Sequence, residues 1–243
     1  RTPGFNGSPP AEPVDRPGAF CVRRALVRVF LAAALGCAAA QGPQASAPNA
    51  RSVERHYLRH MVFAGRGDTF LLHWGRRAMP LRVFLLAPPE GLFPDPEGIE
   101  RTVRQAVLAW SDAAGPGLPA FEFVDSAGEA DIPILWAETP SGDWAIAFCS
   151  YDLNLAQLRF GVSHVLVTGR WGKGGLADLE SIHKVVLHEM GHALGLGGHS
   201  PDPRDILFRS IDSEASGLSA ADRETLRRLY EHGPRRYSGR RSR

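Results

Sequence analysis

The stretch His188–His199 reads HEMGHALGLGGH, and the other parts of the chain are interpreted around it. His188 and His192 are four residues apart, so on a helix their imidazoles share one face, one turn apart, and can chelate a single tetrahedral metal ion. Glu189 lies roughly 100° around the helix from His188, beside such a metal rather than in line with the histidines. A carboxylate in that position can hold an activated water molecule and serve as its general base.

A glycine break and a third histidine follow this helical pair. Gly195 lets the chain leave the helix in a left-handed conformation, which is the usual reason for a glycine just past a helix end. The segment that turns back carries His199, our predicted third ligand, and the fourth position of a catalytic zinc site stays open for water and substrate. Asp202 and Asp205 are alternative ligands in place of His199, although turn and capping roles are the simpler interpretation of both.

The same stretch resembles the HExxHxxGxxH signature of the metzincin metallopeptidases, and HEMGHALGLG resembles the matrixin-like branch in a divergent, bacterial-type form. Two positions depart from the family pattern. The third histidine of the pattern falls at Gly198, so His199 comes one residue late, and Gly197-Gly198 are flexible enough to absorb the extra residue as a bulge. Leu207 stands where the family has the methionine of the turn beneath the zinc, and its similar volume and apolarity suit the same packing role.

The resemblance implies a zinc metalloendopeptidase that hydrolyses peptide bonds. It implies that Zn²⁺ is bound by His188, His192 and His199, and that Glu189 is the catalytic general base. It also implies a protein or peptide substrate lying extended along an edge strand, for which Trp144–Tyr151 is the candidate.

Two other hypotheses stay open at this point. The shifted His199 and the leucine at position 207 motivate a catalytically inactive zinc-binding or interaction module of the same fold. The retained Glu189 favours the enzyme instead, because a structural zinc site needs no acid there and usually closes with a fourth ligand. A third hypothesis is another kind of metal-dependent hydrolase.

The pattern of elements fits an α+β, zincin-like catalytic domain over residues 69–232. A helix capped by Asp95 should end near Gly115, a second should run from about Asp178 to Leu194, and a third should start at Ser219. By resemblance, a twisted, mostly parallel sheet packs on two long helices, with the C-terminal helix added. Six apolar, β-branched or aromatic runs are expected to be strands: 70–74, 81–86, 121–124, 132–136, 144–151 and 160–167.

The composition gives no sign of a nucleic-acid partner or of a disulfide framework. The net charge of +2 gives no indication of nucleic-acid binding, and we expect a monomer that acts on protein or peptide substrates. Of the three cysteines, Cys21 and Cys37 lie in the expected leader, so a disulfide framework is not expected. Cys149 then reads as a small buried apolar residue on a strand.

The two ends of the chain are expected to lie outside the catalytic domain. Residues 1–21 read as disordered or non-native sequence, and 22–40 as a signal peptide with arginines before a short apolar run that ends in small residues. Residues 41–68 read as a linker and 233–243 as a basic disordered tail. The protein is therefore expected to be secreted, or to lie in the periplasm or cell envelope. Membrane attachment would require lipidation at Cys37, the lipoprotein alternative.

Overall fold

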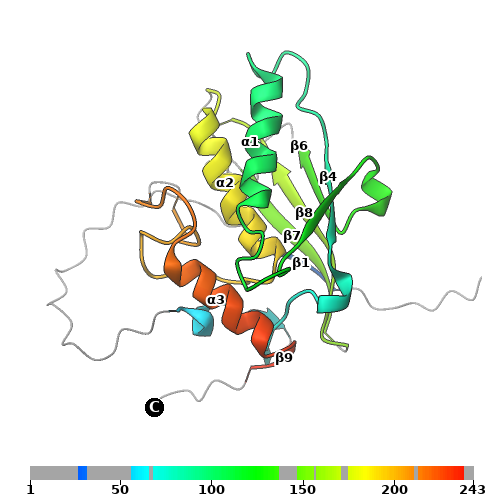
Figure 1. Ribbon diagram of the computed structural model, residues 1–243, viewed down its shortest axis with the longest axis vertical. Coiled ribbons are helices and arrows are strands. Elements are labelled where there is room, and N and C mark those ends of the chain that lie inside the picture. The colour runs from blue at the N-terminus through cyan, green and yellow to red at the C-terminus, as the bar shows by residue number, and fades with distance from the viewer. Residues whose placement is uncertain are drawn as a thin grey trace, which may run out of the picture.

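The computed structural model describes residues 27–31 (as backbone), 56–65, 68–136, 147–155, 157–170, 175–210 and 213–237. Within these residues, a large sheet lies against two helices, and a third helix and a small sheet lie at one end (Figure 1). The expected leader 1–21, most of the expected signal peptide 22–40, residues 41–55 of the linker and 238–243 of the tail lie outside the described residues, as do 144–146.

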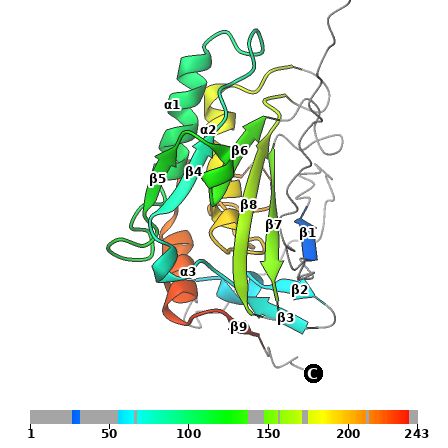
Figure 2. The ribbon, with the colours of Figure 1, turned by 90° about the vertical axis from the view of Figure 1, so that its right-hand side faces the viewer.

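The large sheet has six strands in the order β1-β7-β8-β6-β4-β5. Strands β5, β4, β6 and β8 run parallel to one another, while β7 is antiparallel to β8 and β1 is antiparallel to β7. This confirms the expected mostly parallel sheet and adds two antiparallel pairings at one edge. Figure 2 shows β1 on the outer side of β7. The strands are β1 (Val27–Leu31), β4 (Leu81–Leu85), β5 (Phe121–Val124), β6 (Ile132–Trp136), β7 (Ala147–Asn154) and β8 (Arg159–Val167).

Helices α1 (Pro96–Leu108) and α2 (Leu179–Ala193) lie side by side over one face of the sheet, and α3 (Ala220–Glu231) lies beyond them (Figure 1). The arrangement confirms the expected α+β, zincin-like fold with two long helices and a C-terminal helix. Three short 3-10 helices occur among the described residues. Two of them are η2 (Arg76–Ala78) and η3 (Ala127–Glu129), and the third, η1, belongs to the segment described below.

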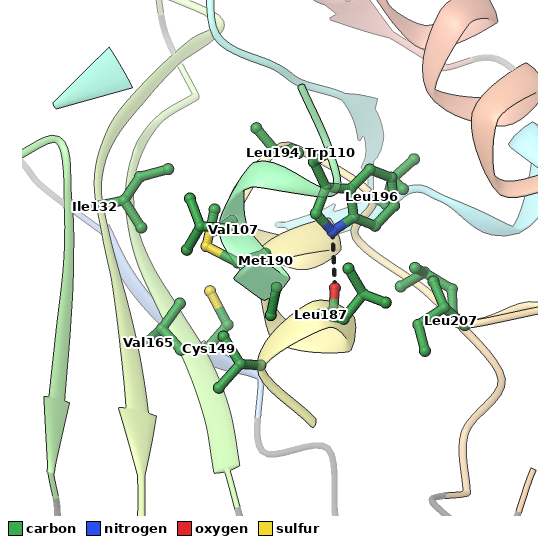
Figure 3. Packing of buried hydrophobic residues seen from close by; sticks show 14 of the residues in the cluster. Val107, Trp110, Ile132, Cys149, Val165, Leu187, Met190, Leu194, Leu196 and Leu207 are labelled. Atoms are coloured by element: carbon green, nitrogen blue, oxygen red, sulfur yellow. Dashed lines mark hydrogen bonds between the residues drawn. The ribbon is translucent and has the colours of Figure 1, made fainter. Parts of the chain in front are cut away.

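Helix α1 begins as its sequence predicts and ends earlier. The Asp95 carboxylate accepts a hydrogen bond from the Gly98 amide at 2.8 Å, which satisfies one of the free amides of the first turn. The helix ends at Leu108, and Trp110 follows in a turn. The Trp110 indole nitrogen donates to the Leu187 carbonyl oxygen at 2.9 Å, which joins the end of α1 to the middle of α2 (Figure 3).

The two halves of helix α2 differ in how deeply they are buried. The Asp178 side chain caps its first turn by accepting from the Ser181 amide at 2.7 Å. Leu179 is 45 % exposed although it lies in the same apolar stripe as the buried Ile182, so protein covers only one side of that first turn. From Val185 to Ala193 every residue is buried, so this half of the helix is surrounded by protein. His188 and His192 therefore lie in a buried environment.

A small three-stranded sheet uses segments that were expected to be linker and tail. Strands β2 (Phe63–Gly65) and β9 (Arg235–Arg236) both pair with β3 (Asp68–Leu71), and the 3-10 helix η1 (Leu58–His60) precedes them. Composition suggested a linker over 41–68, but residues 57–63 contribute four buried side chains to the core: Tyr57, Leu58, Met61 and Phe63. The ordered domain therefore includes this segment.

No helix in the described part of the chain is both long enough and apolar enough to cross a membrane.

The packing of residues 57–63 predicts where a stable fragment can begin. Each large apolar side chain contributes about 1.5–3 kcal/mol when it is buried, so losing four approaches the whole stability of a domain, about 5–15 kcal/mol. A fragment of residues 56–243 should unfold cooperatively in a thermal melt followed by circular dichroism. A fragment of residues 69–243 should lack that transition. An equally cooperative melt of the shorter fragment would show that this segment is dispensable.

Candidate metal centre

The structure brings the three predicted histidine ligands together. One nitrogen from each of His188, His192 and His199 lies within 4.8 Å of the other two. The Nε2 atoms of His188 and His192 are 3.1 Å apart, as expected for two imidazoles one helical turn apart. His188 and His192 are buried and His199 is half-buried, so this nitrogen-rich cluster lies largely inside the protein.

Backbone carbonyls fix the orientation of the two helical histidines. The Nδ1–H of His188 donates to the Ile206 carbonyl oxygen at 2.7 Å, and that of His192 donates to the Leu196 carbonyl oxygen at 2.5 Å. A carbonyl oxygen can only accept, so each Nδ1 carries the proton and each Nε2 keeps a lone pair. The buried Nε2 of His199 has no hydrogen-bond partner among the described residues. A metal cation satisfies such a set of nitrogens.

The electrostatics of the cluster favour neutral imidazoles, the form that binds metals. Burial, with the neighbouring His199, lowers the pKa of His188 to about 3, although the Ile206 carbonyl opposes the change. Burial also lowers the pKa of His192 well below its ordinary value. For His199, burial and then the Arg209 cation lower the pKa to about 4.

The Glu189 carboxylate lies in the same interior without a partner. Neither of its buried oxygens accepts a hydrogen bond from a described residue. Burial raises the pKa of Glu189 to about 8, and the nearby Cys149 backbone amide opposes this rise. Burying an unpaired carboxylate is costly, whereas a cation bound beside it favours its charged form. Glu189 and the histidines therefore fit a site for a divalent metal such as zinc.

The loop after α2 depends on glycines for two different reasons. Gly195 has a φ of +114°, as its place past the helix end predicts, and a Cβ there would lie 2.3 Å from the Leu72 carbonyl oxygen. Gly198 was expected to absorb the extra residue by flexibility. A Cβ on it would instead lie 1.9 Å from the His60 carbonyl oxygen. Its conformation is not in the left-handed region, so close packing against His60 explains the glycine.

Leu207 lies beneath α2, where a packing role was expected. It is fully buried, and a Cβ on Gly191 would lie 2.7 Å from its Cδ2 atom. Its carbonyl oxygen accepts from the Ser200 amide at 2.8 Å, which ties the turn to the residue that follows His199. Figure 3 shows Leu207 near the end of the core that contains Leu187 and Trp110.

The alternative carboxylate ligands have structural roles. Asp202 forms an ion pair with Arg204 at 2.6 Å, and that pair lowers the pKa of Asp202 to about 2. Asp205 accepts from the Ser200 hydroxyl at 2.5 Å and from the Ser219 hydroxyl at 2.6 Å. Neither belongs to the cluster of ligand atoms, so the simpler of the two sequence interpretations agrees with the geometry.

A small hollow adjoins the helical side of the site. Its volume is about 10 Å³, which has room for roughly one water molecule. The Lys184 ammonium donates to the Ser213 carbonyl oxygen at 2.5 Å across the lining. Sequence reasoning did not identify this hollow, because its walls come from α2 and from a loop with no motif of its own. Its residues are Lys184, Val185, His188, Glu189, Ile206, Ser210 and Ser213.

Comparison with known proteins agrees with this geometry. The family model described as Matrixin matches residues 89–231, more than half of the 243 residues. A curated relative, macrophage metalloelastase of Oryctolagus cuniculus, is 30 % identical over 142 residues, which cover 55 % of this chain and 29 % of the relative. The chain therefore spans less than a third of that relative's length.

The cluster predicts one zinc ion per chain and identifies which residue completes the site. His199→Ala should weaken zinc binding by more than about a hundredfold, because changes to groups that merely support a ligand already cost 10–100-fold. Asp202→Ala, the matched control, should leave the affinity unchanged. Competition with a chromophoric chelator measures both. Weakened binding in Asp202→Ala with normal binding in His199→Ala would reverse the assignment.

Proposed function

The chain belongs to the matrixin family, and from this membership we propose that it is a zinc-dependent endopeptidase with His188, His192 and His199 as ligands. Two observations support the proposal: one nitrogen from each of three imidazoles lies within 4.8 Å of the other two, and the buried, unpartnered carboxylate of Glu189 belongs to the residue after His188 and lines the same small hollow. Zn²⁺, when bound, supplies the Lewis-acid chemistry that lets water attack a peptide carbonyl near neutral pH.

Glu189 is the proposed general base. It follows His188 directly in the buried half of α2, so its position is set by a rigid helix rather than by a loop. Because water is largely excluded there, a carboxylate has a higher affinity for a proton than it has in solution. Glu189 can therefore accept a proton from the attacking water and pass it to the departing amine nitrogen.

The outer edge of β7 is the proposed site for the substrate backbone. In the structure this edge is paired by β1, antiparallel, with Leu31 opposite Cys149. The Cys149 backbone also lies beside Glu189, so an extended chain on this edge passes close to the proposed base. A substrate would bind by the same main-chain pairing. Loss of residues 22–40, if they are a signal peptide as the sequence predicts, would remove β1 from the edge.

A second function has one observation in its favour. The hollow beside Glu189 is only large enough for about one water molecule, which leaves no room for a peptide there and so suits a closed metal module. In that alternative the same three histidines bind zinc, and the protein acts by interaction and not by hydrolysis.

Replacing the proposed base separates the two functions. Glu189→Gln keeps the shape of the side chain but cannot accept a proton, and losing a general base costs about 10²–10⁴-fold in rate. Hydrolysis of an unfolded generic protein by the 41–243 fragment with zinc should fall by that factor, with one zinc still bound. A chelated sample should be inactive. Undiminished activity of Glu189→Gln would refute the base, and zinc binding without cleavage by any sample would favour the inactive module.

Competition for the β7 edge gives a separate prediction. The 41–243 fragment should hydrolyse an unfolded protein several-fold faster than the 1–243 chain, because β1 then no longer pairs with β7. A synthetic peptide of residues 25–33 should slow the fragment, whereas a scrambled peptide of the same composition should not. Equal rates for both chains, with no effect of the peptide, would place the substrate elsewhere.

A further inference from the structure

Residues Tyr57–Phe63, which we call the N-terminal strap, lie next to the chain segment that completes the metal centre. The strap precedes the family-matched region 89–231, and no motif in the sequence connects it with the site. It nevertheless packs on the loop that carries His199. A Cβ on Gly197 would lie 2.9 Å from the Phe63 ring, and the Gly198 backbone lies against the His60 carbonyl.

A chain of hydrogen bonds leads from the strap to a metal-binding histidine. The Tyr57 hydroxyl donates to one oxygen of the Asp222 carboxylate. The other oxygen of Asp222 accepts from the Ile206 amide at 3.0 Å. The Ile206 carbonyl then accepts from the Nδ1–H of His188 at 2.7 Å. Two residues, Asp222 and Ile206, therefore separate the Tyr57 hydroxyl from the imidazole of His188.

We propose that Tyr57 is a positioning residue of the metal centre: its hydroxyl fixes Asp222, Asp222 fixes the backbone at Ile206, and the Ile206 carbonyl orients the His188 ring. The inference rests on the proposed function, because it takes His188 to be a zinc ligand. It extends that function to a segment outside the matched family region.

The burial of Asp222 explains why a single hydroxyl matters. Asp222 is fully buried at the start of α3, and burial raises its pKa, while hydrogen bonds from Tyr57, Ile206 and Ser219 oppose the rise. A buried carboxylate that loses a donor turns toward another or accepts a proton. Either change alters the bond from Asp222 to the Ile206 amide, and so the position of the carbonyl that holds His188.

The strap is also held by a second hydrogen bond and by the buried ring of Tyr57. The role of the Tyr57 hydroxyl can therefore be tested without removing these contacts. The Tyr57 amide donates to the Thr225 hydroxyl at 3.0 Å, and the Tyr57 side chain is buried in the core. Tyr57→Phe keeps this backbone bond and the ring, and removes only the hydroxyl. Tyr230→Phe is a matched control: the Tyr230 side chain is also buried, and its hydroxyl donates to the Leu194 carbonyl oxygen at 3.2 Å, outside the path to His188.

The test uses the full chain loaded with Zn²⁺ for affinity and with Co²⁺ for ligand geometry. Tyr57→Phe should bind zinc about tenfold more weakly, the lower end of the effect of groups that support metal ligands. Its Co²⁺-loaded form should show a shifted visible absorption band. Tyr230→Phe should match the unmodified chain in both measurements. In an Asp222→Asn background, Tyr57→Phe should have no further effect on zinc affinity.

Three results would overturn the inference or its premise, and each is distinguishable. A lowered melting temperature in Tyr57→Phe, with unchanged zinc affinity and cobalt spectrum, would make Tyr57 a structural residue only. The same change in Tyr230→Phe would show general loosening of the fold in place of a path to His188. Absence of metal binding by the unmodified chain would instead refute the proposed function on which the inference rests.

Discussion

Burial of the C-terminal half of α2 is the constraint on which the rest of the structure depends. The helix places two imidazoles and a carboxylate in the interior, where unpaired polar groups are costly. The structure satisfies each Nδ1 with a backbone carbonyl and leaves each Nε2 and the Glu189 carboxylate for a ligand. The same burial keeps the imidazoles neutral. A site built this way is prepared for a cation before any cation binds.

The carbonyls that orient the imidazoles come from the chain that follows α2, so that segment must be held as firmly as the helix. Gly195 turns it sharply, and Leu207 anchors it under Gly191. The cap of α3 supports it from the other side, because Asp222 satisfies both the helix start at Ser219 and the Ile206 amide. Elements that contribute none of the three clustered histidines thus determine where those histidines lie.

Local features of the sequence predicted the fold well because they depend on neighbours in the chain. The caps at Asp95 and Ser219, the start of a helix near Asp178, the four-residue spacing of His188 and His192, and the apolar strands all have this character. The exposure of Leu179 was not predicted, since periodicity shows which face is apolar but not where along α2 the covering protein begins.

The N-terminal strap was missed for a related reason. The contact between Tyr57 and Asp222 joins residues 165 positions apart, and nothing in the local pattern near Tyr57 distinguishes it from a linker. In the local sequence, Asp222 is the fourth residue of the Ser-x-x-Asp cap that begins α3. Its second role, at the Ile206 amide, requires the turn after His199 to lie beside α3, and that placement is a property of the packed core.

The displaced third histidine is explained by a second contact of the N-terminal strap with a distant segment, the contact between His60 and Gly198. In the family pattern the position of Gly198 holds the ligand, and here it holds a residue without a side chain, pressed against the His60 carbonyl. The strap thus occupies the space that a side chain at 198 would need, and His199 supplies the imidazole at the cluster. The departure therefore does not by itself argue for loss of the metal. In the proposed enzyme, access to Glu189 would be set by the small hollow beside it and by what pairs with the outer edge of β7.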